Sequence, residues 1–148
     1  MSDGPIVWGR PWALLTTRLV LGLIFFMAGL WKVFDLGPVA HARNMFVEPY
    51  ADSLLPAWSL WATGVTVPVV ELMAGALVLV GWLRRPAYLA LAGVLVLVTF
   101  GHLVAEPLYP FHQHVVPRLG LLLLLLWAPL EADRFAIDEV GRGRSTPI

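Results

Sequence analysis

The stretch that decides the fold runs from Trp12 to Phe34 and reads WALLTTRLVLGLIFFMAGLWKVF. A helix that crosses the hydrocarbon of a membrane needs roughly 20 mostly apolar residues, and this stretch is long enough. Its only charged residues are Arg18 and Lys32. We therefore predict a membrane-spanning helix at this place, with two charges that need a partner or a cavity.

The rest of the chain has the same apolar character. Of its 148 residues, 59% are hydrophobic and 14% are charged, whereas a soluble domain has about 45–50% apolar and about 25% charged residues. The formal net charge is zero, so the composition gives no basic surface for nucleic acid. The absence of cysteine excludes disulfides and thiolate metal sites. The partner that the composition predicts is the lipid bilayer.

Three further apolar segments follow, at 57–82, 87–105 and 115–130. Pro and Gly interrupt the stretch 35–56, which we expect to be a loop. The last segment is the weakest span, because its purely apolar part is short; it either starts earlier, near His114, or thins the bilayer locally. We predict an all-α fold in which residues 1–148 form a single transmembrane domain, an integral membrane four-helix bundle. The alternative has three spans and a buried half-helix.

The basic residues predict the orientation of the bundle. They gather before the first span, between the second and third, and after the fourth, at Arg10, Arg84, Arg85, Arg134, Arg142 and Arg144. Loops rich in Lys and Arg stay on the cytoplasmic side. We therefore expect a multi-pass protein of the inner, cytoplasmic membrane, with the N- and C-termini cytoplasmic and the histidine-bearing loops outside.

Each predicted span carries one stripe of polar or small residues at helical spacing. Small residues let neighbouring helices approach closely. The stripes are Arg18, Gly22, Phe25, Gly29 and Lys32 in the first span; Gly64, Pro68, Glu71 and Gly75 in the second; Tyr88, Ala92, Leu95, Thr99, His102 and Glu106 in the third; and His114 with Arg118 in the fourth.

The depth of these residues predicts which of them meet. Arg18 lies about 9 Å from Trp12, and Glu71 about 15 Å from Gly81 on the same side, so we expect a buried Arg18–Glu71 ion pair. This pair either fixes the helix register or takes part in function. The remaining polar residues belong near the opposite membrane face, where we expect one shared cavity. The predicted ligand-binding residues are Arg18, Lys32, Glu71, His102, His114 and Arg118.

The histidines leave two alternatives open. They either end their helices as solvated side chains, or His102, His112 and His114 hold a metal or haem. The His-x-His spacing is a weak signal and no acidic ligand cluster accompanies it. We therefore predict no metal site.

The segment Arg18–Lys32 resembles the opening of DoxX-family membrane proteins, in which Arg is followed by two Gly and a Lys at this spacing. The segment Pro68–Gly75, with Glu71 before a small residue and Gly75, then Gly81 and the basic turn Arg84–Arg85, is similar to the family's second helix. The resemblance implies a four-helix membrane subunit similar to the DoxD subunit of thiosulfate:quinone oxidoreductase. It also implies that Arg18, Lys32 and Glu71 are central residues.

These observations favour a redox-associated membrane subunit that handles a quinone or a similar small apolar molecule. The apolar tail is expected to run between the glycine-lined helices. The alternative is a non-catalytic scaffold subunit of a larger respiratory or photosynthetic complex, whose glycine faces pack against partner helices. A solute carrier is disfavoured, because the chain has no inverted repeat. The sequence assigns no catalytic residue.

Overall fold

The computed structural model describes residues 6–106 and 110–142. Among the basic residues that predict the orientation, Arg144 and the side chain of Arg142 lie outside the described part.

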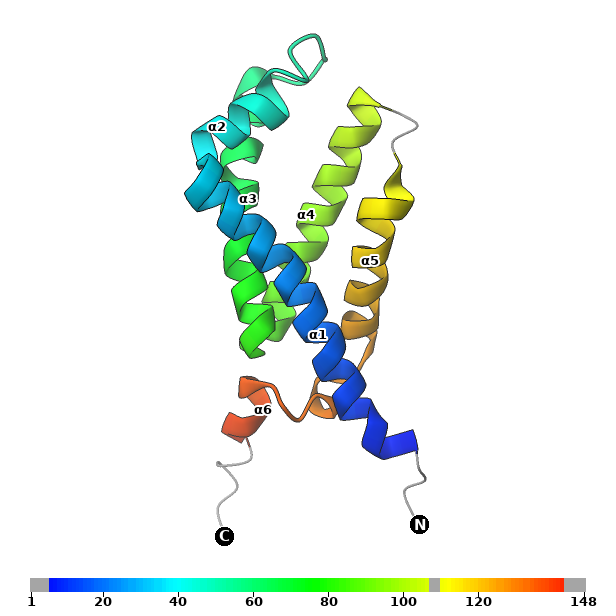
Figure 1. Cartoon of the computed structure of the whole chain (residues 1–148). Helices are drawn as coiled ribbons and strands as arrows, with labels where there is room; N and C mark the ends of the chain where they lie inside the picture. The colour runs from blue at the N-terminus through cyan, green and yellow to red at the C-terminus, as the bar shows by residue number, and fades with distance from the viewer. Residues whose placement is uncertain (1–5, 107–109, 143–148) are drawn as a thin grey trace.

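In the described part of the chain, four long helices make up the bundle (Figure 1). The first, α1 (Ile6–Leu30), continues into the π-helical turn η1 (Trp31–Leu36), and α3 (Ala57–Val80), α4 (Arg84–Ala105) and α5 (Phe111–Trp127) follow. Three of them are long and apolar enough to cross a membrane, and α5 is a shorter apolar helix. The described residues contain no strand. The predicted all-α membrane bundle is therefore confirmed, and the chain is a multi-pass membrane protein.

The fourth helix starts before the apolar segment that marked it in the sequence. It begins at Phe111 and ends at Trp127, whereas the sequence pattern placed the span at 115–130. Its 17 residues extend about 26 Å, slightly less than the roughly 30 Å of hydrocarbon. The helix therefore begins three residues before His114 and is also shorter than the hydrocarbon is thick.

Glycines set the packing of α1 against α3. A Cβ atom at Gly29 would lie 2.4 Å from the backbone nitrogen of Leu72, and one at Gly75 would lie 2.5 Å from that of Phe26. No side chain fits at either position, so the two backbones touch. These contacts fix the register, with residue 29 level with residue 72.

The stretch expected to be a loop is partly helical. It contains α2 (Pro38–Ala42) and the π-helical turn η2 (Arg43–Val47). Pro38 stands in the first turn of α2, where its missing N–H costs nothing. A Cβ atom at Gly64 would lie 2.5 Å from the Cα of Ala42, so α2 packs directly on α3. The loop prediction was wrong here because proline was interpreted only as a helix breaker.

The residues after α5 fold back across one end of the bundle, the end at which α1 begins (Figure 1). They form the short helical turn η3 (Leu130–Ala132) and α6 (Ile137–Arg142). The backbone N–H of Asp138 donates to the carbonyl of Gly81 at 3.1 Å. Its carboxylate accepts from the N–H groups of Leu83 and Arg84 at 3.1 and 3.2 Å. This segment thereby satisfies donors at the start of α4.

Candidate functional site

The buried charges form two separate clusters, so the predicted Arg18–Glu71 ion pair is wrong. Nε of Arg18 donates to Oδ2 of Asp133 at 2.8 Å, and the two side chains are 2% and 5% exposed. Nζ of Lys32 pairs instead with Oε2 of Glu71 at 2.6 Å. Glu71 therefore pairs with the other cation of the first-span stripe.

The register of α1 and α3 explains this exchange of partners. Nη1 of Arg18 donates to the carbonyl of Val78 at 2.9 Å, so Arg18 lies level with the end of α3. Seven residues separate Val78 from Glu71, which is about 10 Å of helix and too far for the guanidinium. The sequence estimate set Trp12 level with Gly81, but α1 extends past the end of α3 (Figure 1).

The Arg18 cluster is structural in character. Arg18 also donates to the carbonyl of Leu79, at the negative end of the α3 dipole. Nearby, Arg84 donates to Glu139 at 2.7 Å and lies 3.7 Å from Asp133. These ion pairs fasten the segment after α5 to the end of the bundle.

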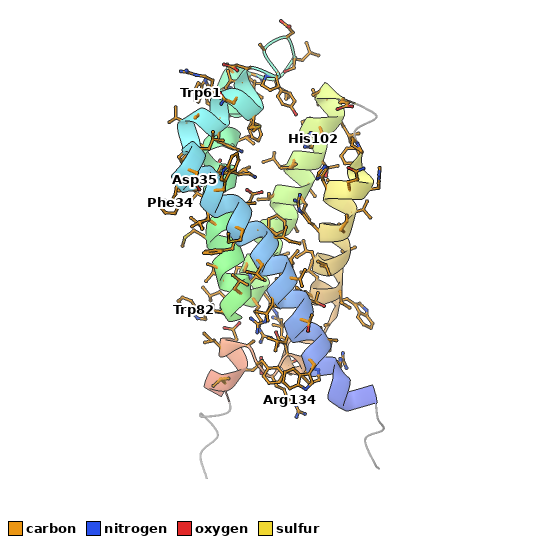
Figure 2. All side chains as sticks on the ribbon, in the orientation of Figure 1. Phe34, Asp35, Trp61, Trp82, His102 and Arg134 are labelled. Carbon is orange, nitrogen blue, oxygen red and sulfur yellow. The ribbon has the colours of Figure 1, made fainter. Side chains whose placement is uncertain are left out.

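The second cluster lies at the opposite end and lines a cavity of about 180 Å³, which we term the polar cavity. The polar side chains that line it are Lys32, Glu71, His102, His114 and Arg118. Figure 2 shows His102 at this end of α4 and Arg134 at the other end of the bundle. The structure thus brings together five of the six predicted site residues and leaves Arg18 outside.

The polar cavity carries one net positive charge when its histidines are neutral. Glu71 compensates Lys32. The guanidinium of Arg118 is half-buried and has no ion pair or hydrogen bond within the part of the chain that the structure describes. A partly desolvated cation favours an electron-rich oxygen as its partner.

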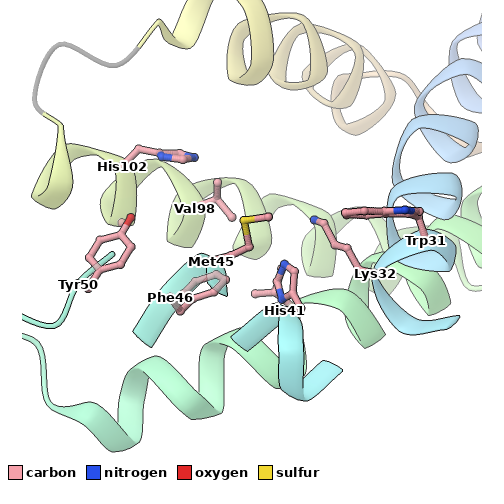
Figure 3. Close-up of a pocket in the computed structure, with 10 residues that line it drawn as sticks. Trp31, Lys32, His41, Met45, Phe46, Tyr50, Val98 and His102 are labelled. Carbon is pink, nitrogen blue, oxygen red and sulfur yellow. The ribbon is translucent and has the colours of Figure 1, made fainter. Parts of the chain in front are cut away.

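An apolar cavity of about 200 Å³ adjoins the polar cavity (Figure 3). Both cavities are lined by Lys32, Val98 and His102. A third cavity of about 250 Å³ continues from the apolar one and shares Phe46 and Tyr50 with it. Together they form a series that leads from the polar cluster to the space between η2 and α4.

His41 lines the apolar cavity and was not predicted from the sequence. Its side chain is buried, and Nδ1 lies 2.7 Å from the carbonyl oxygen of Gly64. A carbonyl only accepts, so Nδ1 carries the proton and Nε2 of the neutral ring is an acceptor. Burial lowers the pKa of His41, and the Gly64 hydrogen bond only partly opposes this effect. His41 is therefore neutral at pH 7.

The position of Lys32 follows from local structure. It stands in η1, where the helix widens into a π-helical turn, a feature often found at functional sites. Figure 3 shows its side chain directed from η1 into the space beside His41 and Val98. Lys32 thus lies where the polar cavity and the apolar one meet.

The histidines do not gather into a metal site in the described part of the chain. Within residues 6–106 and 110–142, no group of three or more His, Cys, Asp or Glu side chains has metal-binding geometry. His112 does not line the polar cavity, whereas His102 and His114 do. The site is accordingly an arrangement of hydrogen-bonding and charged groups around a partly apolar space.

Comparisons with known proteins agree with the sequence resemblance. The DoxX family model matches residues 13–103, which is more than half of the chain. The match includes Arg18, Lys32, His41, Glu71 and His102, and it ends before α5. Searches of curated proteins and of solved structures found no match. Because the family match covers three of the four long helices and the Lys32–Glu71 pair, the chain belongs to the DoxX family.

Proposed function

We propose that the protein is a redox-associated subunit of the cytoplasmic membrane that binds a quinone or a similar small apolar molecule. The observation that carries this proposal is the contact between the polar cavity and the apolar cavity. They meet at Lys32, Val98 and His102. A quinone likewise joins a polar headgroup to an apolar tail.

The cavity sizes set how such a ligand lies. Each cavity has a volume of 250 Å³ or less, below the roughly 300 Å³ at which pockets for drug-sized ligands begin. A ligand must therefore occupy more than one cavity. The headgroup fits the polar cavity, and the tail fits the apolar cavity and its continuation toward η2.

The expected path of the tail between glycine-lined helices is wrong. The backbones of α1 and α3 touch at Gly29 and Gly75 and leave no space for a ligand. The space between η2 and α4 replaces it as the proposed path. Its lining is mainly apolar and aromatic, and includes Trp31, Met45 and Phe46.

The polar groups suit both redox states of a quinone headgroup. The oxidised ring presents carbonyl oxygens, which accept hydrogen bonds from Lys32 or Arg118. The reduced ring presents hydroxyls, which donate to an acceptor of the polar cavity such as the carboxylate of Glu71.

The scaffold alternative was based on glycine faces that would pack against helices of partner subunits. The structure does not favour this use of the glycines. Gly22, Gly29 and Gly75 instead face side chains and backbone of this same chain. Quinone binding is therefore the better-supported function, and assembly with other subunits remains compatible with it.

A substitution at the junction of the cavities tests the proposal. Val98 is an uncharged residue that lines both cavities. Val98→Trp therefore fills the space where the two cavities meet and leaves the charged side chains in place. Its matched control is Val96→Trp, two residues away on the lipid-facing side of α4, where the side chain is 71% exposed.

The measurement is equilibrium binding of a short-tailed ubiquinone analogue to the purified protein in detergent. We expect Val98→Trp to weaken binding by at least about tenfold, a loss of about 1.4 kcal/mol, and Val96→Trp to bind like the wild type. Equal binding by both variants, with both still folded by circular dichroism, would exclude these cavities as the quinone site.

A further inference from the structure

A separate cavity of about 150 Å³ lies at the other end of the bundle, between the start of α4 and the end of α5. We term it the interface cavity. Arg85 and Tyr88 line it from α4, Leu125 and Leu126 line it from α5, and Glu131 follows α5. Exposed Trp82 and Trp127 stand at the same helix ends, as is typical of residues at a membrane–water interface.

The interface cavity has charges of both signs that do not pair with each other. Arg85 and Glu131 both line it, and neither has an ion pair among the residues that the structure describes. The helix dipoles add to this pattern, because the positive start of α4 lies beside the negative end of α5. The site therefore complements a ligand that carries a positive and a negative group.

Tyr88 adds a hydroxyl to the lining. Its side chain is 2% exposed, and its hydroxyl has no hydrogen bond within the described part of the chain. A hydroxyl donates one hydrogen bond, and an oxygen of a ligand in the interface cavity can accept it.

We propose that the interface cavity binds the zwitterionic headgroup of a membrane phospholipid. The phosphate contacts Arg85 and accepts from the hydroxyl of Tyr88, and the ammonium contacts Glu131 and the free carbonyls at the end of α5. The acyl chains leave along Leu126, which is 40% exposed toward the bilayer. This lipid site is independent of the proposed quinone site at the opposite end.

The test is native mass spectrometry of the purified chain titrated with phosphatidylethanolamine or phosphatidylglycerol. Both lipids have a phosphate, but only the first has an ammonium group. We expect the wild type to prefer phosphatidylethanolamine. Arg85→Gln should weaken both lipids at least about tenfold, the loss typical of a hydrogen bond to a charged group. Glu131→Gln should remove the preference, and Tyr88→Phe should weaken both lipids.

The control is Arg134→Gln, which removes an exposed charge near the same end (Figure 2) without touching the cavity lining. It should bind like the wild type. Free phosphoethanolamine in excess should compete with the bound lipid, because it presents the same phosphate and ammonium groups to the cavity. Equal binding of the two lipids by the wild type, or unchanged binding by Arg85→Gln, would overturn the proposal.

Discussion

Replacing Asp133 by alanine should destabilise the bundle more than replacing Glu71. The Arg18–Asp133 pair is almost fully buried, and removing one partner of a buried pair costs about 3–5 kcal/mol. Arg18 keeps its bonds to the Val78 and Leu79 carbonyls, so we expect the lower end of that range. The uncompensated guanidinium would remain buried.

Breaking the Lys32–Glu71 pair should destabilise the bundle less than breaking the Arg18–Asp133 pair. The Lys32 side chain is 22% exposed, and a long lysine side chain can turn its ammonium group toward water once its partner is lost. We therefore expect Glu71→Ala to cost about 1–2 kcal/mol, a buried-pair loss reduced by solvent screening. The experiment tests whether Asp133→Ala loses more stability than Glu71→Ala.

The assay is denaturation of the purified protein in mild detergent by increasing fractions of sodium dodecyl sulfate, followed by circular dichroism. The double variant Arg18→Met with Asp133→Leu removes both charges together and should recover part of the loss from Asp133→Ala. If Asp133→Ala unfolds like the wild type while Glu71→Ala unfolds early, the assignment of partners in this account is refuted.

Three further predictions follow from the packing and the charges. Gly29→Ala should cost about 1–3 kcal/mol in the same assay, because its Cβ meets backbone, whereas Gly93→Ala, whose Cβ meets nothing within 4 Å, should leave the stability unchanged. Burial raises the pKa of Asp138, but hydrogen bonds from the start of α4 outweigh it and hold the pKa below its ordinary value. Its stabilising contribution is therefore complete above about pH 4 and is lost as the pH falls through the lowered pKa; in Asp138→Asn this acid-dependent loss, measured by unfolding at decreasing pH, should be smaller. Because the chain has no cysteine, Leu54→Cys should react with an impermeant thiol reagent in intact cells and Arg134→Cys should not; the reverse pattern would contradict the predicted orientation.

Much of the bundle was predictable because hydrophobic periodicity and span length dominate in a membrane. The spacing of Lys32 and His102 along separate helices, together with their approximate depths, also indicated that both line one polar cavity. The same reasoning applied to His114 and Arg118, one turn apart on α5. These predictions needed only the helix rise and the apolar boundaries of each span.

The partner of each charge was not predictable in the same way. The register of α1 against α3 depends on where glycine lets the backbones touch, and an error in aligning the helix ends assigned Glu71 to Arg18. Asp133 was overlooked because it follows the last span, where no periodicity indicates that the chain returns to the bundle. His41 was overlooked because the stretch around Pro38 was interpreted as a loop.

The central claim is that the cavities around Lys32, Val98 and His102 hold a quinone. The most direct measurement is photolabelling of the purified protein with a photoreactive quinone analogue, followed by mass-spectrometric mapping of the labelled residues. The account predicts labels on η1, α2, η2 and the part of α4 near His102, which an excess of unlabelled quinone suppresses. Labels spread over lipid-facing residues such as Leu89 and Val96, without suppression by competitor, would contradict it.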